Sequence, residues 1–173
     1  MSAEELRARI REIPDFPKPG ILFYDITTLL KDGAAFRESI DLMLEPYRGE
    51  TIDIVVGMES RGFIFSAPMA YQLNAGLVPV RKLGKLPAET ITVEYALEYG
   101  SNTLEIHRDA IQAGQKVLIV DDLLATGGTV QGTIELVERL KGVVVGLAFL
   151  VELDFLKGRD RLDNRRVTSV IKY

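Results

Sequence analysis

Residues 117–129 read Val-Leu-Ile-Val-Asp-Asp-Leu-Leu-Ala-Thr-Gly-Gly-Thr, and this run predicts a strand, a turn and the start of a helix. The apolar residues Val117–Val120 are typical of a buried strand, and two carboxylates, Asp121 and Asp122, end it. The small residues 125–129 then open into an amphipathic helical pattern. A glycine-rich turn at a helix N-terminus offers free N–H groups and a positive dipole end, which suit a phosphate. The two carboxylates are expected to face sugar hydroxyls or a hydrated cation, so a sugar phosphate fits both halves.

Strand-like and helical patterns alternate over most of the chain. Apolar runs predict strands at 52–56, 76–80, 143–151 and 167–173, and helical spacing predicts helices at 35–47 and 63–73. This alternation predicts an α/β fold with a mostly parallel, twisted sheet that helices flank on both faces. Ligands of such sheets bind at the carboxyl ends of the strands. Three polar or glycine-rich loops are expected at that edge, at 57–62, 81–88 and 121–129.

Two segments depart from the alternation. At the N-terminus, a short helix is expected over 4–11, followed by a proline-rich turn and an extended stretch over 21–26. In the middle, residues 89–95 alternate in polarity and 103–107 can return as their partner strand, which predicts a hairpin. The polar loop at 81–88 is long enough to be functional rather than a simple connection.

Composition narrows the possible classes of protein. The chain has 173 residues, 47% of them hydrophobic and 27% charged, which suits one globular domain spanning 1–173. It has no cysteine and one histidine, so disulfides, thiolate chemistry and a histidine-rich zinc site are not expected. The net charge of −4 argues against nucleic-acid binding. No apolar run suits a signal peptide or a membrane span, so we expect a cytoplasmic protein without membrane contact.

The opening motif is similar to the phosphoribosyl pyrophosphate (PRPP) motif of the type I phosphoribosyltransferases. Other segments resemble, in order, the parts of those family members that use adenine: 14–26, 59–63, 81–87, 97–100 and 156–159. The resemblance covers the chain from residue 14 onward. It implies a type I phosphoribosyltransferase fold, with a small N-terminal hood over roughly 1–33 and a mobile loop and hairpin over roughly 81–109.

The resemblance also implies a reaction in which adenine and PRPP give AMP and pyrophosphate. The ribose phosphate is expected to lie in a cradle whose backbone N–H groups and hydroxyls come from Ala125, Thr126, Gly127, Gly128 and Thr129. Asp121 and Asp122 are expected to accept hydrogen bonds from the ribose hydroxyls. We expect Mg²⁺ to be held mainly by PRPP oxygens and water, with no protein ligand assigned to it.

The remaining site residues follow from the same resemblance. The departing pyrophosphate is expected to contact Ser60, Arg61, Arg81, Lys82 and Lys85. Glu98 is expected to handle the proton at the purine imidazole ring, and the backbone groups of Leu22 and Tyr24 to read adenine. From the residues alone, Arg61 is also compatible with a surface position, and Glu98 with an ordinary solvated carboxylate at a hairpin tip.

Three other functions share parts of this pattern. A transferase for hypoxanthine or xanthine would differ in the hood and in residues 97–100. A PRPP-sensing regulator would add a nucleic-acid-binding element, and a PRPP synthetase would need a much longer chain with an ATP site. We expect adenine and PRPP as substrates, and a homodimer from the family resemblance.

Overall fold

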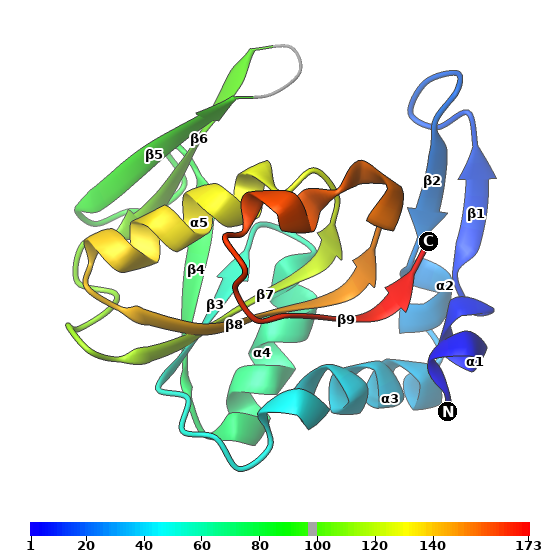
Figure 1. Cartoon of the computed structure of the whole chain (residues 1–173), viewed down its shortest axis with the longest axis horizontal. Coiled ribbons are helices and arrows are strands. Elements are labelled where there is room, and N and C mark those ends of the chain that lie inside the picture. Colours follow the sequence, from blue (N-terminus) through cyan, green and yellow to red (C-terminus); the bar gives the residue numbers. More distant parts are fainter. Residues whose placement is uncertain (97–99) are drawn as a thin grey trace.

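The computed structural model describes residues 1–96 and 100–173 and is built around a mixed, twisted sheet (Figure 1). Its strands are β3 (Ile54–Met58), β4 (Gly76–Lys82), β5 (Thr90–Ala96), β6 (Ser101–His107), β7 (Lys116–Leu124), β8 (Val143–Glu152) and β9 (Val167–Lys172). They lie in the order β5-β6-β4-β3-β7-β8-β9. Strands β4, β3, β7, β8 and β9 run parallel, and the β5–β6 hairpin is antiparallel. The predicted fold class is confirmed.

Helices cover both faces of the sheet. Helices α3 (Gly33–Leu44) and α4 (Gly62–Leu73) lie on one face and α5 (Gly128–Arg139) on the other (Figure 1). Strand β7 shows why both faces must be covered, because its side chains alternate between two apolar cores. Leu118 and Val120 pack in the core on the α3 and α4 side, whereas Val117 and Ile119 pack in the core that includes α5 residues.

The N-terminal segment forms the small hood that the sequence predicted. It contains α1 (Ala3–Arg7), β1 (Arg11–Pro14), β2 (Leu22–Asp25) and α2 (Thr27–Leu30), with β1 and β2 paired in a separate antiparallel sheet. The predicted helix over 4–11 is too long at its end. Arg11 instead opens β1, where its side chain forms an ion pair with Asp25 of β2 at 2.5 Å.

The strand after which the acids were expected is longer than predicted. β7 runs on to Leu124, because Asp121, Leu123 and Leu124 continue to pair with β8. Both carboxylates therefore project from a paired strand, and the loop between β7 and α5 shrinks to 125–127. β4 likewise extends to Lys82, because Arg81 and Lys82 pair with β6.

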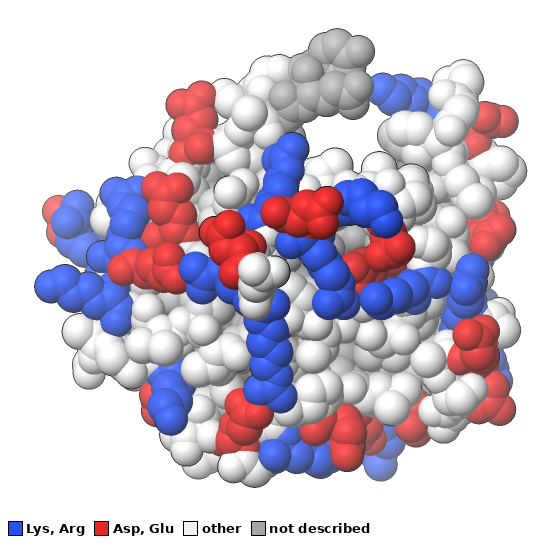
Figure 2. Space-filling model, viewed as in Figure 1, with Lys and Arg blue, Asp and Glu red and all other residues white. Residues whose placement is uncertain are grey.

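Short 3₁₀ turns complete the chain. η1 (Glu45–Tyr47) follows α3, and η2 (Asp154–Leu156) and η3 (Gly158–Arg161) lie between β8 and β9. Figure 2 shows acidic and basic side chains interspersed over the face it presents. Among the described helices, none combines the length and apolar character needed to cross a membrane.

An aromatic stack joins the hood to the C-terminal end of the sheet. The Tyr24 ring of β2 stacks on the Tyr173 ring with centroids 3.8 Å apart. The guanidinium of Arg7, the last residue of α1, lies 4.3 Å from the Tyr173 ring centroid. Tyr173 is itself tied to the turn after β8, since its carbonyl accepts a hydrogen bond from the Asp154 N–H at 2.9 Å. The Tyr24–Tyr173 stack therefore helps to hold the hood against the end of β9.

We expect the two tyrosines to stabilise the fold cooperatively. In a double-mutant cycle with Tyr24→Leu and Tyr173→Leu, urea unfolding should give a coupling free energy of about 1 kcal/mol, because stacked aromatic pairs contribute beyond their buried area. If the two effects simply add, the stack does not hold the hood.

Candidate active site

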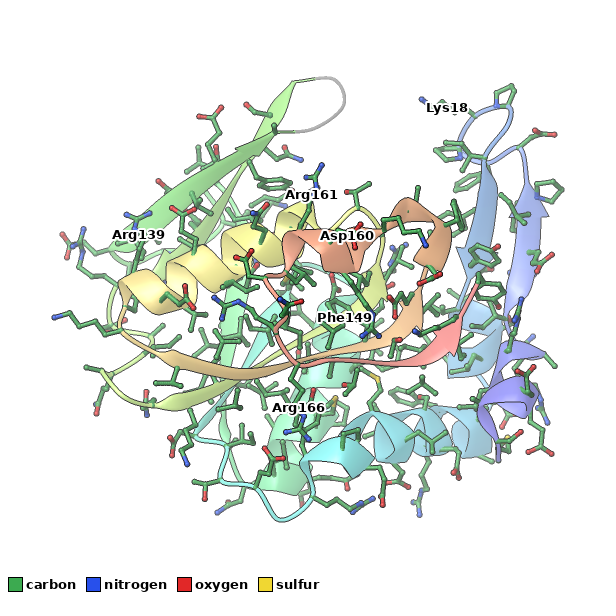
Figure 3. The ribbon with its side chains drawn as sticks, in the orientation of Figure 1. Lys18, Arg139, Phe149, Asp160, Arg161 and Arg166 are labelled. Atoms are coloured by element: carbon green, nitrogen blue, oxygen red, sulfur yellow. The ribbon has the colours of Figure 1, made fainter. Side chains whose placement is uncertain are left out.

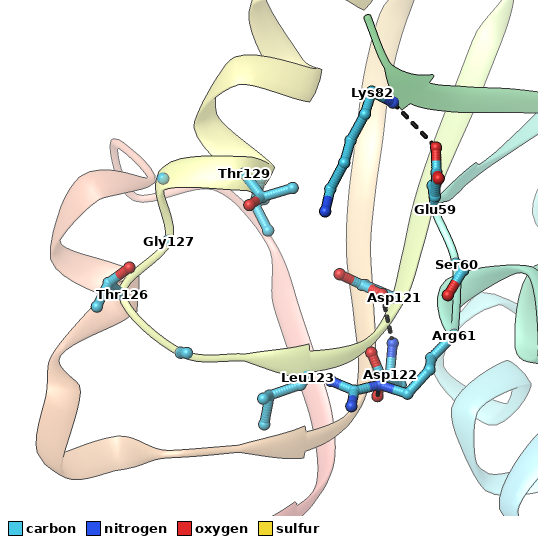
Figure 4. Close-up of a pocket in the computed structure, with 13 residues that line it drawn as sticks. Glu59, Ser60, Arg61, Lys82, Asp121, Asp122, Leu123, Thr126, Gly127 and Thr129 are labelled. Carbon is cyan, nitrogen blue, oxygen red and sulfur yellow. Dashed lines mark hydrogen bonds and ion pairs between the residues drawn. The ribbon is translucent and has the colours of Figure 1, made fainter. Parts of the chain in front are cut away.

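The largest concentration of predicted site residues surrounds a cavity of about 410 Å³ at the carboxyl ends of β3 and β7 (Figure 4). Its walls come from the loop after β3, the end of β4, and the β7–α5 segment. The lining residues are Glu59, Ser60, Arg61, Lys82, Asp121, Asp122, Leu123, Ala125, Thr126, Gly127, Gly128, Thr129 and Val130. Residues at or just after the ends of three parallel strands thus converge, as the topology predicts.

The loop before α5 has the backbone geometry of an anion site. Gly127 adopts the left-handed conformation (φ 87°) and caps α5 without a side-chain hydrogen bond. The first N–H groups of an α-helix have no partner within it, so those of Gly128, Thr129 and Val130 are available to a ligand. The site therefore offers several donors and the positive end of a helix dipole to the cavity.

The two carboxylates occupy different surroundings. Both aspartates line this cavity. Only Asp122 also lines a second cavity beneath the hood. The start of α4 lies close to Asp121: a Cβ built on Gly62 would come within 2.7 Å of its Oδ1 atom. Burial, followed by the charge of Asp122 and its hydrogen bond, raises the pKa of Asp121 well above its ordinary value.

Asp122 is held by a cation from the neighbouring loop. The Arg61 Nε atom lies 2.7 Å from Asp122 Oδ2, while the Arg61 side chain remains about half exposed. Its guanidinium also faces the Phe23 ring at 5.7 Å. Arg61 therefore stands between the two cavities and contacts both the sheet and the hood.

Glu59 gathers the other cations at the end of β4. It accepts hydrogen bonds from the Arg81 Nε at 3.3 Å and the Lys82 N–H at 3.0 Å, and its other oxygen pairs with Lys85 Nζ at 3.5 Å. Burial raises the pKa of Glu59, but the Lys82 hydrogen bond and the charges of Arg81 and Lys85 outweigh it and lower the pKa overall. The Glu59–Ser60 peptide bond is cis.

The second cavity, of about 190 Å³, lies between the hood and the sheet. It is mainly apolar and is lined by Ile21, Leu22, Phe23, Tyr24, Ile26, Arg61, Asp122, Leu123, Val151 and Leu153. Arg61, Asp122 and Leu123 line both cavities, so the two adjoin. A polar cavity with anion-binding geometry therefore opens beside a smaller, mainly apolar one.

The structure brings most of the predicted residues together. The five cradle residues, both aspartates, Ser60, Arg61 and Lys82 line the first cavity, and Leu22 and Tyr24 line the second. Arg81 and Lys85 line neither and instead contact Glu59. Glu98 lies outside the described residues.

Some residues of the site were not singled out from the sequence. Glu59 was missed although it follows β3 at the predicted edge, and that position was a usable signal. Gly62 and Gly158 were missed because their importance lies in close contacts with Asp121 and Ala125, distant in sequence. Among the described residues, no cluster of three or more acidic or histidine side chains is arranged to hold a metal ion.

Comparisons of this chain with a family model, with related sequences and with solved structures all point to the same family. The model of the phosphoribosyl transferase domain matches residues 25–172. An adenine phosphoribosyltransferase of Acidobacterium capsulatum is 60% identical, over all of this chain and 96% of the relative. The crystal structure of the Thermoanaerobacter pseudethanolicus adenine phosphoribosyltransferase is 55% identical with a TM-score of 0.96, over 99% of this chain and all of that one.

A Saccharomyces cerevisiae adenine phosphoribosyltransferase adds ligands to the comparison. Its structure, complexed with D-2,5-dideoxy-2,5-imino-altritol 1,6-bisphosphate and adenine, is 44% identical with a TM-score of 0.91, over 97% of each chain. The chain described here therefore belongs to the phosphoribosyltransferase family. Within that family it belongs with the adenine phosphoribosyltransferases.

The raised pKa of Asp121 predicts a cost in stability. A carboxyl group whose pKa is higher in the folded protein binds more protons there, so stability falls as the pH rises from the ordinary Asp value through the folded one. Asp121→Asn should therefore raise the Tm by a few degrees at pH 7, with the gain fading near pH 4.

Thermal melts from pH 4 to pH 8 measure this difference, with Asp109→Asn as the matched control because Asp109 is exposed. If the Tm of Asp121→Asn equals that of the wild type at every pH, the pKa of Asp121 is not raised.

Proposed function

We propose that the two adjoining cavities bind PRPP and adenine, and that the chain transfers the 5-phosphoribosyl group to adenine N9, giving AMP and pyrophosphate. The observation that carries this proposal is the shared wall formed by Arg61, Asp122 and Leu123. A ribose held at that wall has its phosphate on the polar side and its C1 atom facing the apolar side. Holding both reactants in this way can supply much of the rate acceleration.

The ribose phosphate is assigned to the cradle formed by residues 125–129. Its N–H groups and the hydroxyls of Thr126 and Thr129 are the donors, and the dipole of α5 favours the negative charge. Asp121 and Asp122 then accept hydrogen bonds from the ribose hydroxyls. Their charge also favours the cationic character that the ribose ring gains as pyrophosphate leaves.

The pyrophosphate is assigned to Ser60, Arg61 and Lys82 in the first cavity. In the structure, Arg61 pairs with Asp122, and Glu59 pairs with Arg81 at the end of β4 and with Lys85 in the loop that follows. The pyrophosphate of PRPP is more highly charged than a carboxylate, so it competes with Asp122 and Glu59 for both groups of cations. Arg81 and Lys85 reach it only by leaving Glu59, so we assign them to closure of the loop over the substrate.

Adenine is assigned to the hood cavity, where a strand edge can read it. Pro14 has no N–H and lies opposite Leu22, which indicates a non-hydrogen-bonded pair in the β1–β2 sheet. By alternation, the Glu12–Tyr24 pair is of the same kind, so the backbone groups of Leu22 and Tyr24 face away from β1. A C=O and an N–H suit the adenine amine and N1, and they mismatch a 6-oxopurine, which presents an acceptor and a donor there.

Magnesium is assigned to the substrate rather than to a protein cage. Asp121 and Asp122 are the carboxylates that point at the ribose, and Asp122 is already paired with Arg61. This donor set fits an ion carried by PRPP oxygens and water, which Mg²⁺ commonly prefers. The ion would neutralise charge on the departing pyrophosphate.

The chain is also proposed to form a homodimer, and α4 offers a suitable surface. This helix carries no charged residue, and its Tyr71 and Ile64 side chains are exposed, as is Leu77 at the start of β4. An uncharged helix with exposed apolar side chains suits contact with a second copy of the chain. Sedimentation of the purified protein tests the dimer, and a monomer at micromolar concentration would contradict it. The cytoplasmic location stays a prediction.

An assay that compares four purine bases as substrates tests the proposed reaction. The purified protein with PRPP and Mg²⁺ is expected to convert adenine to AMP, with kcat/KM for adenine at least about 100-fold above that for hypoxanthine, guanine or xanthine, because mismatched donors leave buried polar groups unpaired. Faster turnover of a 6-oxopurine would overturn the assignment of the hood cavity to adenine.

Glu98 is proposed to act as the base that removes the adenine N9 proton, and this rests on the family resemblance. Glu98→Gln should lower kcat about 100-fold or more, the range for loss of a general base, while PRPP affinity stays near wild type. Steady-state rates combined with PRPP titration by calorimetry separate the two quantities. An unchanged kcat would remove Glu98 from this role.

A further inference from the structure

The segment between β8 and β9 lies directly against the proposed phosphate cradle. In Figure 1 this segment, drawn in orange, runs beside the loop that leads into α5. The contact is made by backbone: a Cβ built on Gly127 would come within 2.7 Å of the Gly158 carbonyl oxygen. In the opposite direction, a Cβ on Gly158 would come within 2.4 Å of the Ala125 carbonyl oxygen. Two buried glycines therefore allow two chain segments to touch.

Gly158 is fixed in place by its neighbour Arg159. The Arg159 guanidinium donates to both oxygens of Glu152, from Nε at 2.6 Å and from Nη2 at 2.8 Å. Nη1 donates to the Val167 carbonyl at 3.1 Å, and Nη2 also reaches the Ser169 hydroxyl at 3.3 Å. A guanidinium with this many partners has a defined orientation, as bidentate pairs with carboxylates generally do.

Glu152 connects Arg159 to the strand that leads into the cradle. It is the last residue of β8, pairs in register with Leu124 immediately before the cradle, and its side chain is only 3% exposed. Burial raises the pKa of Glu152, but hydrogen bonds from Arg159 and Ser169 outweigh this effect and lower it, so the pair is ionised at neutral pH. The ring of contacts runs from Leu124 through Glu152, Arg159 and Gly158 to Ala125 and Gly127.

Contacts from outside the cradle matter because a glycine, Gly127, lies at its centre. Gly127 adopts a left-handed conformation without a side-chain cap, and a glycine adopts many other conformations at little cost. The geometry points to Glu152 and Arg159 as positioning residues, which press Gly158 against residues 125–127 and so set the backbone N–H groups for the ribose phosphate. This inference deepens the proposed function and rests on the cradle being the phosphate site.

Two substitutions separate this role from general stability. Arg159→Gln removes the charge that orients Gly158, and Gly158→Ala leaves every charge in place but pushes on the Ala125 carbonyl. Glu50→Gln is the matched control, because it breaks the partly exposed Arg166–Glu50 ion pair, whose Arg166 lies near α3 rather than α5 (Figure 3). Each protein is assayed with adenine and PRPP and is titrated with ribose 5-phosphate by calorimetry.

The positioning role predicts a selective loss of phosphate binding. In both variants, the KM for PRPP and the Kd for ribose 5-phosphate should rise about 10-fold or more, since small misplacements of positioned groups have large effects. The KM for adenine should stay within about two-fold of wild type, because neither Gly158 nor Arg159 lines the hood cavity assigned to adenine. A uniform loss of folded protein would change neither KM, so it would not give this pattern. Glu50→Gln should leave all three constants unchanged.

Folded variants that bind ribose 5-phosphate as wild type does would overturn the inference. If Arg159→Gln does not fold, Gly158→Ala alone decides. Failure of the proposed function gives a different result, because the wild-type protein would then not convert adenine to AMP. Binding of ribose 5-phosphate would still report on the cradle in that case.

Discussion

The parallel pairing of β7 with β3 and β8 is the constraint on which the rest of this structure depends. Val117–Val120 are completely buried between two cores, and their register with β3 fixes where both strands end. As a result, the loop after β3 and the loop after β7 open at one edge of the sheet, although more than 50 residues separate them in the sequence. Pairing with β8 then carries Asp121 and Asp122 outward to meet that edge.

The electrostatics of the site follow from this convergence. Burial, followed by the charge of the adjacent Asp122, raises the pKa of Asp121, while Asp122 is compensated by Arg61. Glu59 plays the same part for Arg81 and Lys85. Asp122 and Glu59 are thus each paired with cations from neighbouring strand ends. In the proposed function, substrate binding is an exchange of partners, in which the pyrophosphate pairs with the cations and the ribose hydroxyls donate hydrogen bonds to the aspartates.

Much of this arrangement could be predicted from the sequence, because its signals are local. The apolar run, the two acids and the glycines at 117–129 indicated both the strand–turn–helix unit and its ligand chemistry. The exact ends of elements could not be predicted in this way. Helix α1 ends early because Arg11 pairs with Asp25, and β7 continues because of its partner strand, and neither partner is local.

The contacts that shape the site were harder to predict for the same reason. Gly158 lies in a segment rich in charged residues, and only the folded structure shows that its lack of a side chain lets it touch Ala125. The pairing of Glu59 with Arg81 and Lys85 depends on β4 lying beside β3. Motifs therefore predicted the chemistry, whereas tertiary packing determined which neighbouring residues surround the predicted site.

The central claim is that a phosphate site and an adenine site share one wall. A crystal structure of the protein with AMP tests it most directly. The account predicts the 5′-phosphate within hydrogen-bond distance of the N–H groups of residues 126–129, with the adenine ring in the hood cavity against Leu22 and Tyr24. An adenine ring bound outside that cavity, or a phosphate away from the α5 N-terminus, would contradict it.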